Sequence, residues 1–352
     1  MSIKTTDEGR IVYLDYLRVY GTIAIMVLHT ASQNWNNVQF DSYEWHVFNC
    51  FDALVRWGVP VFVMISGALF LSKDISIRLI YSKYVFHMLT AFFVWSAVYA
   101  ILTEKSVGDC ILAALKGHYH MWFVLMITGL YICIPLMNSI IKTDLTARYF
   151  MILALFFAVI IPTAKNLMED FSDRSAFGYR IAQALFSDIG MFCVSMVMGY
   201  TGYFIYGYYL NKTDVSEKNR RIIYGLGLLG LIFTLGLNVA ASYISQGTVL
   251  NYNTVFSFTI LLESTAVFVY FKYRTYDNIK LNALVRTLSG YCFGAYLAHT
   301  AFIGLLDSRF GINTLFYNPL IMVPSIVLFD IIASFTVSAF MNHIPVIKKY
   351  LV

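Results

Sequence analysis

The chain has 352 residues, of which 59% are hydrophobic, 17% aromatic and only 13% charged, and its mean hydropathy is +0.67. Soluble domains carry about 25% charged residues, and disordered chains are rich in charge and poor in aromatic residues, so both classes are excluded. The net charge of +5 is spread over short gaps between apolar runs. Nucleic-acid binders cluster their basic residues on one face, so no nucleic-acid partner is predicted.

Ten stretches are apolar over about 20 residues, the length that a helix needs to cross a bilayer. They lie near 11–32, 46–71, 80–102, 120–140, 149–164, 188–210, 222–244, 253–271, 288–306 and 317–341. Continuous apolar runs such as 152–157 do not alternate as the strands of a membrane barrel do. We therefore predict an all-α, polytopic membrane helix bundle of about ten transmembrane helices, with one membrane-embedded domain over 1–352 and no soluble domain.

Lys and Arg are concentrated in alternate loops, and such loops face the cytoplasm. Lys73, Arg78 and Lys83 belong to one of these loops, and Lys348 and Lys349 follow the tenth stretch. The bias predicts that both termini are cytoplasmic.

Ionisable residues within spans are candidates for function. In the first stretch, Asp15, Arg18, Thr22 and His29 fall on one side of a helix. Arg18 and His29 differ by eleven positions, which places them about 16 Å apart along the axis. The alternative is that Asp15 and Arg18 simply form a neutral ion pair at i,i+3, with His29 at the interface.

Other charged groups are buried in the later stretches. Asp52 and Arg56 are spaced i,i+4, which favours a local ion pair. Glu263 and Asp330 have no cation nearby in the sequence, so one of them is a candidate partner for Arg18 or Arg56 across the bundle.

The histidines give weaker signals. His118 and His120 resemble a metal pair, but zinc needs three or four ligands and no Cys or acidic residue lies nearby, so no metal site is predicted. His299, late in the ninth stretch, is predicted to lie at the same depth as His29.

Four motifs occur in order along the chain. They are Arg18 and His29 with ten residues between them, Gly-Val-Pro-Val-Phe to Ser-Gly at 58–67, His-Met-Trp-Phe to Gly-Leu-Tyr and Pro at 120–135, and Ser-Gly-Tyr-Cys-Phe-Gly-Ala-Tyr-Leu-Ala-His at 289–299. With these motifs the chain resembles the acyltransferase 3 family of bacterial integral-membrane acyltransferases over nearly its whole length. Within the family it looks most like the stand-alone enterobacterial common antigen O-acetyltransferase type.

The resemblance implies that an acetyl group passes from cytoplasmic acetyl-CoA to a hydroxyl of a cell-surface or lipid-linked glycan, in the bacterial inner membrane. It implies no bound cofactor, with acetyl-CoA as a substrate. His29 is the expected general base, because its ordinary pKa lies close to working pH, and Arg18 and Asp15 complete the catalytic set. The residues expected to bind the donor or line the cavity are Arg56, Asp52, Arg78, Lys83, Ser66, Trp122, Tyr131, Glu263, Tyr296 and His299.

The competing prediction is a multi-pass transporter or flippase for a small anionic or glycolipid substrate. Charges within spans and Gly or Pro breaks suit such a protein equally well. Transporters often contain paired repeats, and none is visible in this sequence.

Overall fold

The fold is all-helical in the computed structural model, which describes residues 10–104, 106–190 and 194–352. Within these ranges it contains α-helices, short 3-10 and π segments and turns, and no β-strand. The chain divides into two compact units, each assembled from segments that are far apart in the sequence. Unit 1 comprises residues 1–30, 70–139 and 276–352, and unit 2 comprises residues 31–69 and 140–275.

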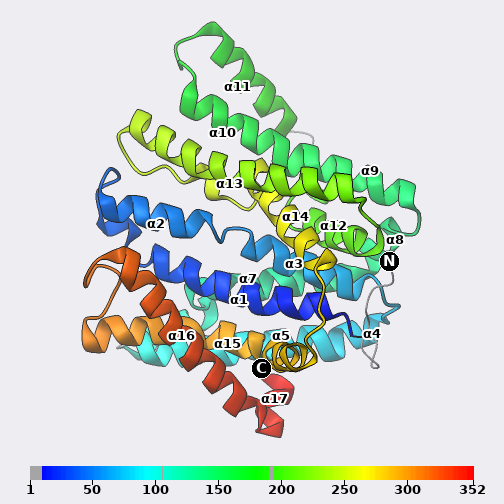
Figure 1. Cartoon of the computed structure of the whole chain (residues 1–352), viewed down its shortest axis with the longest axis vertical. Coiled ribbons are helices and arrows are strands. Elements are labelled where there is room, and N and C mark those ends of the chain that lie inside the picture. The colour runs from blue at the N-terminus through cyan, green and yellow to red at the C-terminus, as the bar shows by residue number, and fades with distance from the viewer. Residues whose placement is uncertain (1–9, 105, 191–193) are drawn as a thin grey trace. The chain divides into compact units, whose positions relative to one another are not determined.

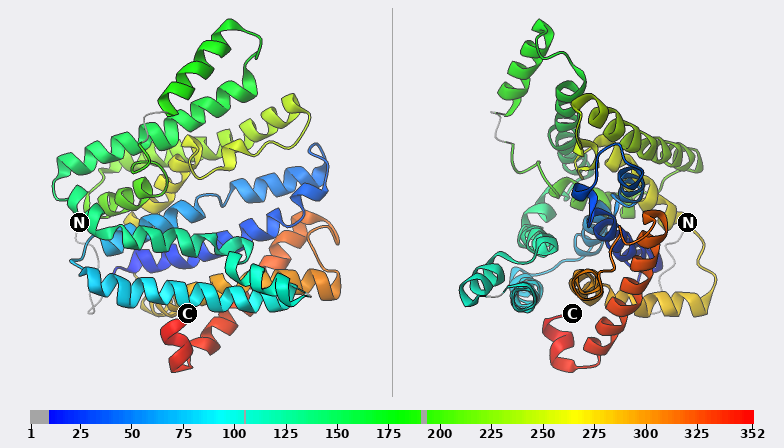
Figure 2. Two further views of the ribbon diagram at one scale, coloured as in Figure 1. Left: turned by 180° about the vertical axis from the view of Figure 1, so that it is seen from behind. Right: turned by 90° about the vertical axis from the view of Figure 1, so that its left-hand side faces the viewer.

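Unit 1 contains the first helix and the C-terminal helices. Its elements are α1 (Val12–Ser32, as far as Thr30), α4 (Ile77–Leu79), η2 (Ile80–Val85), α5 (Phe86–Thr103), α6 (Val107–Lys116), η3 (Tyr119–Met121), α7 (Trp122–Ile132), α8 (Ile134–Ile140), α15 (Ile279–Phe310), α16 (Pro319–Asn342) and α17 (Pro345–Tyr350). Helix α15 packs along α16, and α5 packs against α6 and α7. The right-hand view of Figure 2 looks along several of these helices, which shows that they form a bundle.

Unit 2 contains the elements between them. They are η1 (Trp35–Asn37), α2 (Tyr43–Ala53), α3 (Gly58–Phe70), α9 (Asp144–Ala154), η4 (Leu155–Ile160), α10 (Ile161–Phe171), α11 (Phe177–Gly190), α12 (Thr201–Lys212), α13 (Glu217–Ser245), η5 (Asn251–Asn253) and α14 (Phe258–Tyr273). Helices α13 and α14 follow one another and pack together along their length (Figure 1).

Helices α3 and α12 approach each other through two glycines. A Cβ on Gly67 would lie 1.7 Å from the Phe204 carbonyl oxygen, and a Cβ on Gly207 would lie 2.1 Å from the Met64 carbonyl oxygen. Only glycine permits backbones to come this close, as in the small-residue contacts of membrane helices.

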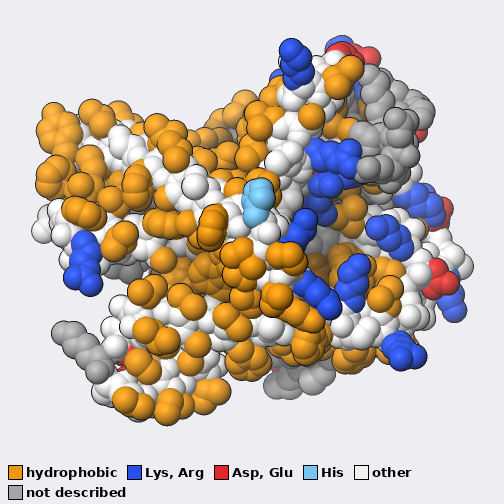
Figure 3. Space-filling model, turned by 90° about the horizontal axis from the view of Figure 1, so that it is seen from below, with side chains coloured by type: hydrophobic (Ala, Val, Ile, Leu, Met, Phe, Trp, Pro, Cys, Tyr) orange, Lys and Arg blue, Asp and Glu red, His pale blue; other side chains and the backbone are white. Residues whose placement is uncertain are grey.

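Seven helical segments of the described residues are long and apolar enough to cross a membrane. They are Tyr43–Phe70, Ile77–Thr103, Val107–Ile132, Asp144–Phe171, Glu217–Ser245, Asn251–Tyr273 and Pro319–Asn342. Hydrophobic side chains cover much of the face in Figure 3, and Lys and Arg gather toward one side of it. A soluble monomer rarely exposes so much apolar surface, so the chain is a polytopic membrane protein. The number of ten spans and the cytoplasmic termini remain predictions.

The other three predicted spans correspond to α1, α12 and α15. Helices α1 and α15 have 21 and 32 residues, so they are long enough but too polar to join the seven. The prediction near 188–210 differs from the structure, where α12 begins only at Thr201. Residues 191–193 of that stretch lie outside the described residues, and Gly199 adopts a φ of 79° in the turn that precedes α12.

Candidate active site

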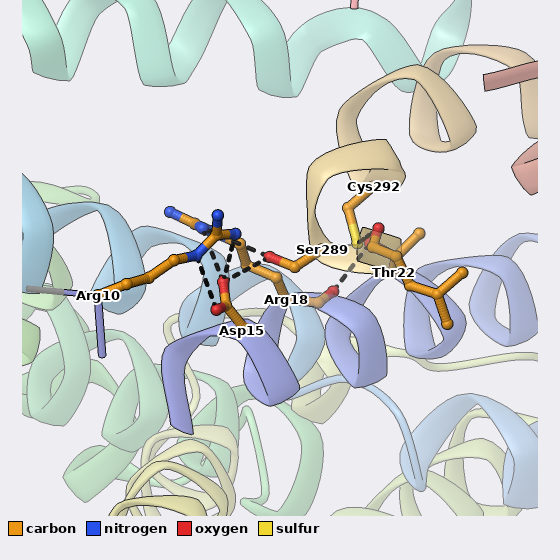
Figure 4. Close-up of polar contacts among 7 residues, drawn as sticks. Arg10, Asp15, Arg18, Thr22, Ser289 and Cys292 are labelled. Carbon is orange, nitrogen blue, oxygen red and sulfur yellow. Dashed lines mark hydrogen bonds and ion pairs between the residues drawn. The ribbon is translucent and has the colours of Figure 1, made fainter. Parts of the chain in front are cut away.

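A charged group surrounds Asp15 near the start of α1, within unit 1 (Figure 4). Arg10 donates to both carboxylate oxygens of Asp15, from Nε and Nη2, each at 2.8 Å. Ser289 of α15 donates to Oδ1 of the same carboxylate, also at 2.8 Å. Two-pronged contacts between Arg and a carboxylate are the strong form of this interaction, so Arg10 is the main partner of Asp15.

Arg18 is held more loosely than the sequence suggests. Its Nη1 lies 3.4 Å from Asp15 Oδ1 and 3.5 Å from Ser289 Oγ, beyond the usual hydrogen-bond distance. The Arg18 side chain is 31% exposed, whereas that of Asp15 is 6% exposed. The i,i+3 pair is therefore present but weak. Because two guanidinium groups surround one carboxylate, the group carries a net charge of +1.

Helix α1 continues without a break from this group to the histidine at its other end. Thr22 lies one turn beyond Arg18, where its hydroxyl donates to the Arg18 carbonyl at 2.9 Å, and Cys292 of α15 lies beside it (Figure 4). Since the helix is continuous, the predicted spacing of about 16 Å between Arg18 and His29 holds.

His29, in the last turn of α1, is paired with His299 of α15. His29 Nδ1 lies 2.6 Å from His299 Nε2, and the two rings are nearly parallel, with centroids 4.9 Å apart. The sequence predicted only that these two histidines lie at the same depth, and the structure shows that they are in direct contact. His299 is fully buried, and His29 is half-buried.

A backbone carbonyl determines which ring nitrogens of this pair carry hydrogen. His299 Nδ1 lies 2.5 Å from the Tyr296 carbonyl oxygen, which can only accept, so Nδ1 of His299 must donate. In a neutral imidazole the other nitrogen is then an acceptor, and His299 Nε2 accepts from His29 Nδ1. Neutral His29 consequently has its lone pair on Nε2, which makes this atom the basic nitrogen of the pair.

A second histidine pair lies beside the first. His120 of η3 is buried, and its ring centroid is 6.2 Å from that of His29 and 5.2 Å from that of His299. His120 Nδ1 lies 2.8 Å from His118 Nδ1 and 3.3 Å from the Thr300 hydroxyl.

Hydroxyl groups lie beside the His120 ring. Thr300 donates to the Tyr99 hydroxyl at 2.8 Å, and Tyr99 donates to the Leu297 carbonyl at 2.7 Å. Thr300 can therefore only accept from His120 Nδ1, whereas His118 Nδ1, which is closer, can donate to or accept from the same nitrogen. From their spacing, His118 and His120 were considered only as a metal pair, and that role was rejected. The signal that could have placed His120 at this site is its position at the start of the aromatic motif at 120–135.

Aromatic side chains surround both histidine pairs. The Tyr296 hydroxyl donates to the His120 carbonyl, and the Tyr296 ring lies 5.5 Å from the His120 ring. The ring of Tyr119, an exposed residue, lies 5.5 Å from that of His29. Tyr296 therefore lies against the histidines, while Trp122 is 44% exposed at the start of α7.

Tyr131, Lys83 and Arg78, which were predicted to bind the donor, also belong to unit 1. Tyr131 stacks on Phe70 with centroids 4.4 Å apart, next to Tyr84, and Lys83 lies 5.4 Å from the centre of the Tyr84 ring. Lys83 and Arg78 are both exposed. Within the described ranges, neither cation has a hydrogen bond or ion pair with the group around Asp15.

Two predicted site residues of unit 2 belong to a polar group, and a third lies on α3. Asp52 is fully buried, pairs with Arg56 as the i,i+4 spacing predicts, and accepts from Asn253 Nδ2 at 2.7 Å. Ser66 lies on α3 beside Gly67.

Each of the two remaining carboxylates accepts a hydrogen bond from a hydroxyl group. Glu263 accepts from Thr234 at 2.9 Å, and Asp330 accepts from Ser334 at 2.8 Å. Neither belongs to an ion pair in the part of the chain that the structure describes, so the suggested pairing with Arg18 or Arg56 is not observed. Arg56 is already matched by Asp52, and the carboxylate beside Arg18 is that of Asp15. The described residues also contain no group of three or more His, Cys, Asp or Glu arranged to hold a metal ion.

Comparison with protein families gives one match. The model of the acyltransferase 3 family, described as an acyltransferase domain, covers residues 11–342, from the start of α1 to the end of α16. Neither the curated proteins nor the solved structures contain a match to this chain.

Proposed function

The chain belongs to the acyltransferase 3 family, and from this premise we propose that it is a membrane O-acyltransferase that transfers acetyl from cytoplasmic acetyl-CoA to a hydroxyl of a cell-surface or lipid-linked glycan. The proposed location is the inner membrane of a bacterium. The observation that carries the proposal is the basic Nε2 of His29, which the His299 contact specifies at one end of α1.

In the proposed reaction, His29 Nε2 takes the proton of the attacking hydroxyl. The hydroxyl oxygen forms a bond to the acetyl carbonyl carbon, the carbon–sulfur bond breaks, and the thiolate of coenzyme A leaves. The thiolate then takes the proton from His29 and departs as the thiol, so protons and charges balance. General base catalysis of this kind is worth about 10²–10⁴-fold in rate.

The other end of α1 suits the anionic donor. The net charge of +1 around Asp15 and the loosely held Arg18 offer a guanidinium fork to a phosphate. The roughly 16 Å between Arg18 and His29 is of the order that an extended pantetheine arm spans. The exposed Arg78 and Lys83 would meet other phosphates of the donor.

His299 acts in this scheme as a positioning residue, because it fixes the His29 tautomer without touching the reacting atoms. A covalent route, in which the acetyl group rests on His29 Nε2, ranks second. Single-turnover mixing with radiolabelled acetyl-CoA and no acceptor separates the two routes. Direct transfer leaves the protein unlabelled, whereas the covalent route labels it.

The experiment that tests the function compares strains that lack this gene and carry the wild type, His29→Ala or His343→Ala. His343 lies just beyond α16, and its Nδ1 lies 2.7 Å from the Ala339 carbonyl oxygen, so its loss should leave transfer unchanged. We expect O-acetyl groups on purified surface glycans with the wild type and His343→Ala, and none with His29→Ala at equal protein level. Full acetylation with His29→Ala would refute the assignment of the base.

A further inference from the structure

Unit 2 contains a cavity of about 340 Å³ that the proposed reaction does not use. It is lined by residues of α9, η4 and α12, with Phe256 and Leu261 on the side of α14. Its walls are almost entirely apolar, and Met151, Ala158 and Val159 are typical of them. Its size is that of a pocket for a small molecule or a single hydrocarbon chain.

The cavity follows from the sequence of the helices around it. Pro162 has no N–H for the Ala158 carbonyl, and its ring crowds that carbonyl, so a regular α-helix cannot pass through this point. The chain instead forms the wider π segment η4, which supplies Leu155, Ala158 and Val159 to the cavity wall. Wide turns of this kind occur often at functional sites.

One cation stands at the end of the cavity. Arg148 lines it and is exposed, and its Nε donates to the Tyr209 hydroxyl at 3.1 Å. The neighbouring cation, Lys212, is already paired with Asp144 at 3.2 Å. Arg148 has no carboxylate partner among the residues that the structure describes, so its two Nη groups remain able to meet an anion.

An apolar cavity with an exposed cation at its end fits an amphiphilic ligand, which has a hydrocarbon part and an anionic head. A lysine or arginine that merely extends to the interface needs no cavity behind it, and an apolar cavity that takes a neutral molecule needs no unmatched guanidinium at its end. The predicted topology places Arg148 at the cytoplasmic face, where anionic lipid head groups lie.

We propose that this cavity binds the hydrocarbon chain of a phosphate-headed lipid, with Arg148 and the Tyr209 hydroxyl on the phosphate. The site lies wholly within unit 2, is distinct from the histidine pairs, and does not depend on the proposed acetyl transfer.

Delipidated protein in detergent can be titrated with farnesyl phosphate, farnesol, phosphatidylglycerol and phosphatidylcholine while bound lipid is counted by native mass spectrometry. Farnesyl phosphate should bind at least about 10-fold more tightly than farnesol, since charge-assisted hydrogen bonds contribute about 1.5–3 kcal/mol. Stronger binding of phosphatidylglycerol than of farnesyl phosphate identifies a membrane phospholipid as the source, and the reverse order identifies a polyprenyl phosphate. Phosphatidylcholine tests whether the net negative charge is needed.

Three variants locate the binding. Arg148→Gln, at an exposed position, should abolish the advantage of farnesyl phosphate over farnesol, and Ala158→Trp should weaken both by filling the cavity. Lys142→Gln is the matched control, because Lys142 is exposed near the start of α9 but does not line the cavity. Equal binding of farnesyl phosphate and farnesol, or equal losses in Arg148→Gln and Lys142→Gln, would overturn the proposal.

Discussion

Two Asp–Arg pairs look alike in the sequence and differ in the structure. In unit 2, Asp52 pairs with Arg56, and the same carboxylate oxygen, Oδ2, also accepts from Asn253. In unit 1, Asp15 is instead held by Arg10 and Ser289, and Arg18 remains loosely bound and partly exposed. The charges of the first pair balance each other, whereas the second leaves the Arg18 guanidinium loosely held and partly exposed. Spacing along a helix shows which charges can meet, but the other neighbours decide whether one of them stays available.

The largest effect on stability should come from breaking the buried Asp52–Arg56 pair. Arg56→Ala leaves the fully buried Asp52 without a cation, which should lower the free energy of unfolding by about 3 kcal/mol. Denaturant unfolding in detergent measures this change. Arg221→Ala serves as the control, because Arg221 belongs to an exposed pair with Glu217 and should change stability by less than about 0.5 kcal/mol. Equal stability of the two variants would mean that Arg56 does not stabilise the buried Asp52 carboxylate.

Removing Arg18, the loosely held cation of unit 1, should reduce activity and leave stability nearly unchanged. Arg18→Ala should reduce kcat/KM for acetyl-CoA by about 10²-fold, which is about 2.7 kcal/mol, because a charge-assisted contact to a phosphate is lost. Its unfolding midpoint should stay near that of the wild type. Lys280→Ala, exposed at the start of α15, is the control. A large loss of stability in Arg18→Ala would make this pair structural, like the other one.

An Arg10→Ala variant tests whether Arg10 is what keeps Arg18 only loosely bound to Asp15. Without Arg10, Asp15 turns to Arg18 and closes that pair, so KM for acetyl-CoA should rise by about 10-fold while kcat changes little. Steady-state kinetics on purified protein separates the two constants. A fall in kcat at constant KM would show that Arg10 does not act by keeping Arg18 available.

The smallest effect is expected at a buried carboxylate that has no cation. Glu263→Gln keeps an oxygen that can accept from Thr234, so the free energy of unfolding should change by less than about 1 kcal/mol. The measurement is the same unfolding experiment, with Arg56→Ala as the reference for a large loss. A loss as large as that of Arg56→Ala would mean that Glu263 has a charged role.

The helical architecture and the two ends of the site, Arg18 and His29, could be predicted from the sequence, because both depend on local patterns. Apolar runs identify helices, and helical periodicity places Arg18 and His29 on one side of α1. The partners could not be predicted in the same way. Ser289 and His120 reach their neighbours through packing between distant segments, and Arg10 precedes α1, outside its helical periodicity. The His29 tautomer depends on the Tyr296 backbone carbonyl. No side-chain pattern encodes such a contact.

Helices α1 and α15 show why hydropathy is least informative near the site. Both are long, yet neither is among the seven apolar candidates. Helix α1 carries Asp15, Arg18 and His29, and helix α15 carries Ser289 and His299. These polar residues lower the mean hydropathy of both helices. Helices that build a polar site inside a membrane are therefore the ones that a hydropathy criterion misses.

The neutral chain from the Tyr296 carbonyl through His299 to His29 has a consequence for membrane energetics. It contains no carboxylate to retain the proton that His29 takes, so in the proposed reaction that proton leaves on the thiol of coenzyme A. One proton then moves inward for each acetyl group that moves outward as an acyl cation equivalent. The exchange is electroneutral, and the membrane potential neither drives it nor opposes it.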